Sequence, residues 1–442
     1  MTRRQGLRII AWAIAAGSIW PIGARAQSAM PPSRVSLDPV SGQTVEDLVT
    51  MALRQSPAGL AARARIEVAR GEAEQAQRRP NPMVSFERRD QMSGTDNQTT
   101  IGIAVPLDLY GRAGRSAVSA RAVEAATADV AEWERRRATE VRVLAVRLIA
   151  ALHHLHVQEE IVATNTQTAH LTAARVEAGS APAVEGDAAL IETRLSEVDA
   201  RRMRAEMETA AAALRSLLGL APTSPIVLKQ SLEDLVALPA LALTDDQIQH
   251  AVDTRSDVRQ REAAVSLEIA RVDLLKREAR PEISVGASYM RMMAGFPQLG
   301  VSPSGGLTPI AGTFHNFAFG ATVSLPWSNR NQGSIAAATA ASAAAGFERD
   351  HQRITAVNDI DALRRREGEA RAALEAFGEG FRDLASKNLE VMRESYQMGR
   401  ATLLDLLAET RRYLAVENAI ASAMLELIEA RVALAGALGE IR

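Results

Sequence analysis

The chain has 442 residues, with 51 Lys and Arg against 53 Asp and Glu, and it contains no Cys. Only 4% of the residues are aromatic, while Ala, Arg, Glu and Leu dominate, which favours long helices over several ordinary globular cores. The near-balanced charge argues against a nucleic-acid-binding protein. The lack of Cys excludes disulfides, thiolate metal sites, thiol catalysis and acylation of an N-terminal Cys.

Residues 1–26 have the pattern of a cleaved signal peptide. Basic residues precede an apolar stretch at 9–20, which is too short to span a bilayer, and Ala24-Arg25-Ala26 forms a small-x-small cleavage site. We therefore expect an exported protein whose mature chain starts at Gln27; an uncleaved anchor is the alternative. No later apolar stretch is long enough to predict a transmembrane helix.

The rest of the chain is predicted to be a duplication, because a series of short motifs recurs in the same order about 200 to 220 residues later. Examples are Thr44 and Thr244, Gly179 and Gly399, and Leu218-Gly219 and Leu438-Gly439. We divide the chain into an N-terminal linker at 27–43, a first repeat at 44–220, an inter-repeat linker at 221–243 and a second repeat at 244–442.

Each repeat predicts the same helices. A helix of about 35 residues (44–79 and 244–279) ends at a proline, and one of about 65 residues (112–177 and 333–397) ends at a glycine turn followed by a last helix of about 35. A helix of 65 residues is about 100 Å long, so we expect these helices to lie side by side in an antiparallel bundle.

Four short segments alternate between apolar residues and polar or small ones, as in Ile101, Ile103 and Val105. They predict strands at about 83–91, 99–107, 282–291 and 316–326, with the pattern of transmembrane β-strands. Amphipathic hairpins packed on helices in a soluble protein are the alternative. Four strands cannot close a barrel and open edges cannot face lipid, so a membrane location requires several subunits to share one barrel.

The residues around these strands resemble those of the TolC-type outer-membrane efflux factors, over residues 44–442, and within that family the cation-efflux (CzcC-like) branch. The motifs that carry the resemblance are Arg78-Arg79-Pro80-Asn81-Pro82, Val105-Pro106-Leu107-Asp108-Leu109-Tyr110-Gly111-Arg112, Leu325-Pro326-Trp327-Ser328-Asn329-Arg330-Asn331-Gln332-Gly333 and Tyr396-Gln397-Met398-Gly399.

The resemblance implies a mainly α fold with a small β part: a long antiparallel coiled-coil bundle plus four transmembrane β-strands per protomer, arranged as an internal two-fold repeat. It also implies a homotrimer with a 12-stranded β-barrel in the outer membrane of a Gram-negative bacterium and an α-helical tunnel in the periplasm. The implied partners are a periplasmic adaptor (membrane fusion) protein and an inner-membrane resistance-nodulation-division pump. We expect an anchorage in outer-membrane lipid without lipidation, and no nucleic acid partner.

By the same resemblance, the helix turns are adaptor contacts and the acids that follow them form a pore gate. The adaptor-contact tips are Gly179, Ser180, Ala181, Pro182, Gly399, Arg400, Ala401 and Thr402. Glu185 and Asp405 would project six carboxylates from a trimer into a narrow mouth, a ring that favours cations and raises some pKa values by crowding. Arg400 would pair with an acid of a neighbouring helix. The alternative is that both acids only occupy first helical turns, where the helix dipole favours them.

No catalytic site, cofactor or resident metal is predicted. His153, His154 and His156 do not share one helix face. Met290, Met292 and Met293 fall at the end of the third predicted strand and are expected to be loop or rim residues. The sequence thus favours a passive duct, not an enzyme, that exports metal cations in a tripartite efflux system. A multidrug or protein-export channel of the same family and a soluble periplasmic coiled-coil scaffold are the alternatives.

Overall fold

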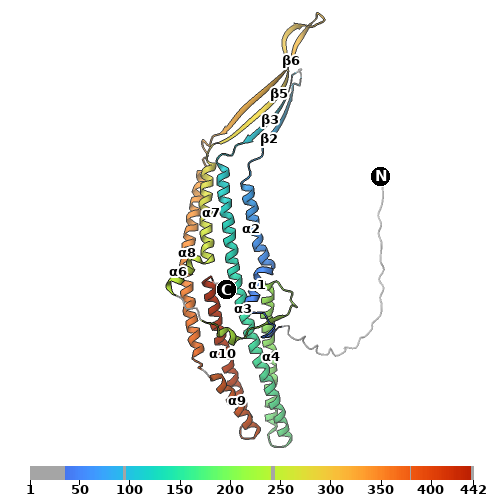
Figure 1. The fold of residues 1–442 in the computed structure, drawn as a ribbon. Helices are drawn as coiled ribbons and strands as arrows, with labels where there is room; N and C mark the ends of the chain where they lie inside the picture. Colours follow the sequence, from blue (N-terminus) through green and yellow to red (C-terminus); the bar gives the residue numbers. More distant parts are fainter. Residues whose placement is uncertain (1–34, 93–95, 240–243, 379, 440–442) are drawn as a thin grey trace, which may run out of the picture. The chain divides into compact units, whose positions relative to one another are not determined.

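The structure is a computed structural model that describes residues 35–92, 96–239, 244–378 and 380–439. The predicted signal peptide lies outside the described residues. The elements run in the order shown in Figure 1, and their bounds in the first half of the chain are β1 (Val35–Leu37), α1 (Val45–Gln55), α2 (Pro57–Ala76), β2 (Met83–Asp90), β3 (Asn97–Pro106), α3 (Gly111–Glu177) and α4 (Ala183–Leu218). The second half contains β4 (Ile226–Leu228), α5 (Leu232–Val236), α6 (Asp245–Thr254), α7 (Ser256–Glu278), β5 (Glu282–Val301), β6 (Leu307–Ser324), α8 (Gln332–Glu375), α9 (Phe381–Gln397) and α10 (Leu403–Ala437).

The predicted fold class is confirmed, because long helices dominate and one small antiparallel sheet accompanies them. Helix α3 has 67 residues, close to the predicted length, and it packs against α4, α7, α2 and α10 (Figure 1). Buried Leu48, Leu148 and Leu214 belong to a core that α1, α3 and α4 share. No helix among the described residues combines the length and the apolar character that crossing a membrane requires.

The two helices predicted at 44–79 and 244–279 are each divided in two, so these predictions are wrong. In the first, Ser56 has an extended backbone, and its hydroxyl caps α2 while Pro57 occupies the first turn. In the second, Arg255 is extended although no proline follows it. Its buried guanidinium donates hydrogen bonds to Asp257 at 3.0 Å and to Asp359 at 3.1 Å, and these contacts stabilise the break between α6 and α7.

The long helix predicted at 333–397 is also interrupted, whereas its counterpart α3 is continuous. Helix α8 ends at Glu375 and α9 begins at Phe381. Between them Gly378 and Gly380 have φ angles of 66° and 81°, which L-residues with a side chain rarely adopt. The second repeat therefore contains a turn within the region where the first contains a straight helix.

One sheet holds four antiparallel strands in the order β2-β3-β5-β6. Strands β5 and β6, with 20 and 18 residues, are much longer than the predicted 282–291 and 316–326. Their hairpin continues beyond the first hairpin, and Asp96, just before the start of β3, accepts a hydrogen bond from the Gly295 N–H. The three methionines 290, 292 and 293 therefore lie within β5, so the prediction that they lie in a loop is wrong.

The segments predicted as linkers contain regular structure. β1, from residues 27–43, pairs in parallel with β4, from residues 221–243, and Val35 faces Ile226 in this ladder. Ser231 and Asp234 form a capping box that begins the short helix α5. The side chains of Val35, Ile226 and Leu232 are buried in the core with α1 and α3, so both segments are parts of the fold.

Candidate functional site

Two helix turns of the same design end α3 and α9. Gly179 and Gly399 have φ angles of 70° and 73°. The Ser180 N–H donates to the Arg175 carbonyl at 2.8 Å, and the Arg400 N–H donates to the Ser395 carbonyl at 2.9 Å. This six-residue closure is the Schellman motif, which requires a left-handed residue and explains glycine at both positions.

The helices that leave the two turns begin differently. Thr402 and Asp405 form a capping box: the Asp405 N–H donates to Thr402 Oγ1 at 3.2 Å, while the Thr402 N–H and hydroxyl donate to Asp405 Oδ2 at 3.1 and 2.7 Å. Pro182 precedes α4 and offers no side-chain cap. The spacing Thr-x-x-Asp is a capping signature that the sequence contained and that the gate interpretation overlooked.

The predicted gate acids, Glu185 and Asp405, occupy the same helical position. Each lies in the first turn of its helix, α4 or α10, where the helix dipole favours a carboxylate. Hydrogen bonds from the side chain and then the backbone of Thr402 hold the pKa of Asp405 below its ordinary value. Within one protomer, the local effect thus keeps this group ionised. The increase in pKa expected from crowding would require other protomers.

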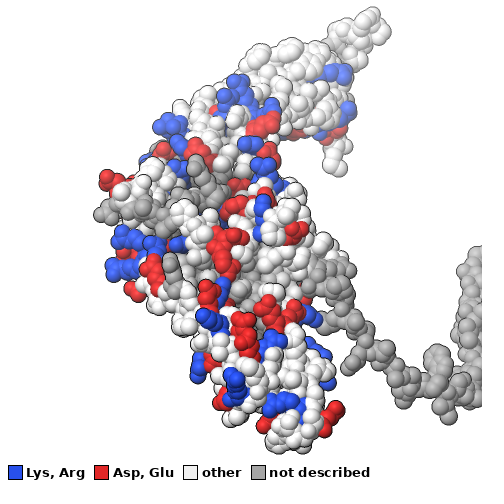
Figure 2. Space-filling view, turned by 60° about the horizontal axis from the view of Figure 1, so that its bottom comes forward, with Lys and Arg blue, Asp and Glu red and all other residues white. Residues whose placement is uncertain are grey.

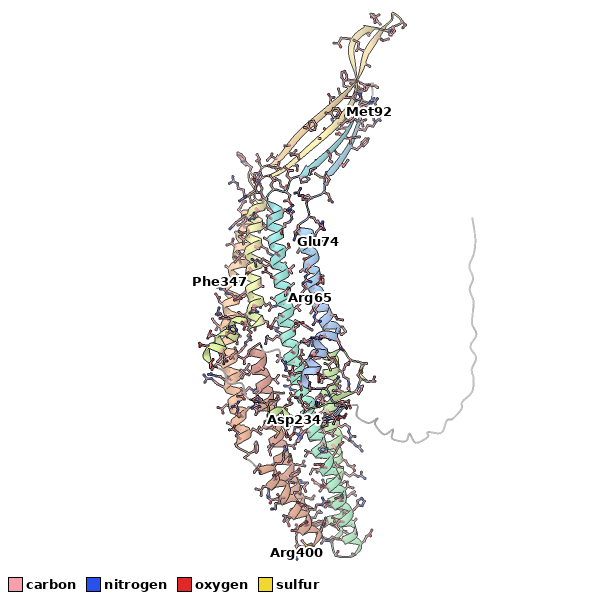
Figure 3. The ribbon with its side chains drawn as sticks, viewed as in Figure 1. Arg65, Glu74, Met92, Asp234, Phe347 and Arg400 are labelled. Atoms are coloured by element: carbon pink, nitrogen blue, oxygen red, sulfur yellow. The ribbon has the colours of Figure 1, made fainter. Side chains whose placement is uncertain are left out.

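Arg400 lies at the turn between α9 and α10 (Figure 3). Arg400 is exposed, and its guanidinium makes no ion pair with any described residue of the same protomer. The pairing of Arg400 with an acid of a neighbouring helix is therefore not made among the described residues of the protomer.

A contact that was not predicted joins the two helical hairpins, α3–α4 and α9–α10, near their turns. Tyr396 of α9 is 1% exposed, and its hydroxyl lies 2.6 Å from Thr172 Oγ1 of α3. The Arg175 guanidinium lies 5.0 Å from the centre of the Tyr396 ring and donates to the Tyr396 carbonyl at 3.3 Å. Tyr396 belongs to a sequence motif quoted above, but its partner is 224 residues away and has no local signature.

Two further features tie these hairpins together. Ala189 of α4 and Tyr396 of α9 share a small buried cluster with Leu403 and Leu406 of α10. Arg411 of α10 donates to both carboxylate oxygens of Glu192 on α4, at 3.3 and 2.7 Å. The ends of the two hairpins thus form one packed unit within a protomer.

At the other end of α3, the sheet separates apolar from polar side chains. The register aligns Phe86, Ile101, Tyr289 and Phe317 in one row, and alternation places the neighbouring apolar residues on the same face. We call this the apolar face; it comprises Val84, Phe86, Ile101, Ile103, Val105, Val285, Tyr289, Phe317, Phe319 and Val323. The opposite, polar face comprises Ser85, Thr100, Gly102, Gly286, Ser288, Asn316, Gly320 and Thr322.

The apolar face is uncovered in the protomer. Phe86, Phe317 and Phe319 are 69%, 74% and 85% exposed. Figure 2 shows Lys, Arg, Asp and Glu intermixed over the helices and sparse around the strands on the face in view. An exposed aromatic surface of this kind marks contact with lipid or protein.

The histidines lie apart from the turns and make separate contacts. His154 Nδ1 is 3.0 Å from Asn418 Oδ1, and His156 Nε2 is 3.5 Å from Glu160 Oε1. His153 is half-buried, and this burial lowers its pKa, with Glu233 opposing the shift and Arg382 adding to it. Within the described ranges, no three His, Asp or Glu side chains gather as a metal site.

Comparison with solved structures shows the same fold in three outer-membrane channels. CusC, whose structures concern folding and transmembrane channel formation, is 16% identical, with a TM-score of 0.71 and coverage of 90% of this chain and 92% of that chain. The outer-membrane channel OprN is 19% identical, with a TM-score of 0.69 and coverage of 91% and 94%. The open state of the MtrE outer-membrane channel of Neisseria gonorrhoeae is 18% identical, with a TM-score of 0.68 and coverage of 89% and 88%.

The family comparison identifies the chain. Curated protein sequences give no significant match. The outer membrane efflux protein family, in contrast, matches residues 48–220 and 247–440, which together form most of the chain. This membership does not support the soluble scaffold, and it assigns the protein to non-enzymatic channels. The chain therefore belongs to the outer membrane efflux protein family, the TolC family of bacterial outer-membrane efflux channels.

Proposed function

We propose that three copies of the chain form a 12-stranded outer-membrane β-barrel continued by a periplasmic α-helical tunnel. The observation that carries this proposal is a four-stranded sheet with one exposed apolar face and unpaired outer edges on β2 and β6. Unpaired backbone groups cost several kcal/mol each in lipid, and about eight strands are the minimum for a barrel. Three protomers supply the missing strands and pair every edge.

Uncovered apolar side chains on the helices also support assembly. On α4, Val184, Ile191, Leu195 and Val198 are more than half exposed, with the 7, 4 and 3 spacing of a coiled-coil seam. On α8, Phe347 is 74% exposed (Figure 3) and Ile354 follows one heptad later. A neighbouring protomer would cover both stripes. Heat-modifiable trimers in outer-membrane fractions are the expected result, and a soluble periplasmic monomer would refute the assembly.

We further propose that the channel is the passive duct of a tripartite system with a periplasmic adaptor and a resistance-nodulation-division pump. The tips at Gly179–Pro182 and Gly399–Thr402 are the proposed adaptor contacts. Both have exposed, sharply turned backbones and lie at the ends of the helical hairpins. The duplicated halves, 44–220 and 244–442, would present six such tips per trimer. Site-specific crosslinking from Ser180, with mid-α4 Asp199 as the control position, tests this contact.

The proposed gate consists of Glu185, Asp405 and Arg400. Three copies of the two acids would form a ring that attracts cations, and Arg400 would bridge to a neighbouring acid. Alanine at Asp405 would also remove the capping box with Thr402 and so destabilise the start of α10. The amide pair Glu185→Gln with Asp405→Asn removes charge and retains an acceptor for the cap.

In planar bilayers we expect the amide pair to raise single-channel conductance and to reduce the preference for cations over anions. The matched control neutralises two exposed acids that lie more than ten residues from the turns at Gly179 and Gly399, Asp199→Asn on α4 with Asp383→Asn at the start of α9. If conductance and selectivity of the amide pair equal those of wild type and of the control, the gate assignment is wrong.

We propose metal cations as the exported class. The carboxylates at the turns and the resemblance to the cation-efflux branch support this choice. A deletion strain should lose tolerance to a divalent or monovalent metal ion and keep its tolerance to antibiotics, and complementation should restore it. Loss of antibiotic tolerance alone would favour the multidrug alternative, and a defect in secretion alone would favour protein export.

A further inference from the structure

One row of the sheet places positive charge on the apolar face. The register aligns Arg88, Thr99, Arg291 and His315 across the four strands. Arg88 lies two residues after Phe86, so strand alternation puts this row on the same face as the aromatic row next to it. We call these four residues the arginine row. A guanidinium on a lipid-facing surface needs an explanation, because it is strongly destabilising at the bilayer midplane and is tolerated only near the interface.

The isolation of Arg291 makes this charge unusual. Between Glu282 and Arg330, Arg291 is the only charged residue in the sequence, and the part of the hairpin that projects beyond it, residues 292–314, is uncharged. The residue is exposed, and no acid of the described protomer pairs with it. Its charge therefore has no ion-pair partner among the residues that the structure describes.

Arg88 forms an ion pair with Asp90 that leaves part of its guanidinium free to bind another group. Its Nε and Nη2 donate to Asp90 at 2.9 Å, while Nη1 takes no part in this pair. Both side chains are more than half exposed, so solvent and salt screen this ion pair. A group with more charge than a carboxylate can therefore compete for this guanidinium.

Aromatic side chains contact the arginine row on the side of the sheet where the aromatic row lies. The Tyr289 hydroxyl lies 2.6 Å from His315 Nδ1, and the two rings stack with centroids 5.9 Å apart. The Tyr289 ring also contacts Phe317, with centroids 5.2 Å apart. An aromatic girdle beside polar groups is the arrangement found where a barrel crosses from hydrocarbon to headgroups.

The spacing along β5 places the row at the outer surface of the bilayer. Arg280, which lies over the Tyr110 ring just before β5, marks the end of the sheet next to the helices. Eleven residues separate it from Arg291, about 36 Å along a strand, which a barrel tilt of about 40° reduces to roughly 28 Å. This height matches the hydrocarbon thickness of a membrane, so with the helices in the periplasm Arg88 and Arg291 reach the outer-leaflet headgroups.

We propose that Arg88 and Arg291, supported by Tyr289 and His315, form a binding site on the outward face of the barrel for the phosphate groups of the outer-leaflet glycolipid. The planar guanidinium matches phosphate through two parallel hydrogen bonds, which a neutral headgroup cannot replace. The inference rests on the proposed function, because the apolar face has to meet outer-membrane lipid. It assigns a ligand to residues that neither the gate nor the helix tips use.

The test compares trimers of wild type, of Arg88→Gln with Arg291→Gln, and of the control Arg89→Gln. Arg89 adjoins Arg88 but points to the polar face, where it pairs with Glu87 at 2.6 Å. Native mass spectrometry of trimers extracted from outer membranes should show at least about ten-fold less bound phosphorylated glycolipid for the double variant, and no loss for the control. If the double variant does not assemble, Arg291→Gln alone, which breaks no ion pair among the described residues, gives the same comparison.

Nanodiscs distinguish the possible sources of phosphate. Delipidated wild-type trimers should gain thermal stability with bisphosphorylated lipid A, and neither dephosphorylated lipid A nor inorganic phosphate with neutral lipid should reproduce the gain. An equal gain with either of these would overturn the inference, as would equal glycolipid retention by the double variant and the control in trimers that conduct ions. Failure of the wild-type chain to form any outer-membrane trimer would instead overturn the proposed function, and this inference with it.

Discussion

The hydrogen bond between Tyr396 and Thr172 gives a sharp prediction about what holds the ends of the two helical hairpins together. Thr172 Oγ1 donates its proton to the Thr168 carbonyl at 2.8 Å. The Tyr396 hydroxyl must therefore be the donor in its 2.6 Å contact with Thr172. Tyr396→Phe removes this one donor from a buried link between the two hairpins and leaves the threonine satisfied by its own bond.

The size of the expected effect depends on the interactions that Tyr396→Phe retains. Phenylalanine retains the buried ring, its packing on Leu403 and Leu406, and the contact with Arg175 5.0 Å from the ring centre. Loss of one buried neutral hydrogen bond costs about 1 kcal/mol. If opening of the trimer separates the hairpins in all three protomers together, the closed state loses about 3 kcal/mol, which is roughly a 100-fold increase in the open-to-closed ratio.

The assay is the open probability of single trimers in planar bilayers. Tyr413→Phe is the matched control, because it deletes the same hydroxyl from a tyrosine whose partner, Glu417, lies one turn away on the same helix. We expect frequent openings for Tyr396→Phe and wild-type behaviour for Tyr413→Phe. Equal open probabilities for the two variants would refute the reasoning that this contact holds the hairpins closed.

Two further predictions concern stability, measured as unfolding of the purified protein. Glu132 is 3% exposed; burial raises its pKa, but hydrogen bonds from Arg135 and other groups lower the pKa overall, so Glu132→Gln should cost about 3 kcal/mol by breaking a buried ion pair. Glu134 pairs with Arg63 at the surface, so Glu134→Gln should cost at most about 1 kcal/mol. Equal losses of stability in the two variants would contradict this account. Burial lowers the folded-state pKa of His153, so the stability contributed by the neutral ring is complete above the unfolded value of about 6.5 and is lost as the pH falls below it. Between pH 7 and 5, His153→Leu should therefore lose less stability than wild type; a wild-type decrease in His153→Leu would exclude this group as the cause.

Features with a local cause were predictable from the sequence. The length of α3, which ends at Glu177, follows from an uninterrupted helical pattern that stops at Gly179. Alternation in β3 and β5 fixed which residues share the apolar face, since successive side chains of a strand point to opposite sides. The turns at Gly179 and Gly399 were likewise visible, because a left-handed helix end needs glycine.

Features that depend on distant partners were not predictable. The break at Arg255 has no proline, and it exists because Asp257 and Asp359 bind the buried guanidinium. The pairing of β1 with β4 joins segments almost 200 residues apart, so neither three-residue strand shows a pattern on its own.

The helix ends near the proposed gate include both a feature with a local cause and a feature that depends on a distant partner. The Thr402–Asp405 cap is encoded within four residues, and the sequence by itself determined it. The contact of Tyr396 with Thr172 was decided by the packing of α9 on α3, which brings the two hydroxyls to 2.6 Å. Helical periodicity says which face of each helix is apolar, but only the folded chain selects which residues of two such faces meet, because many registers bury a similar apolar area.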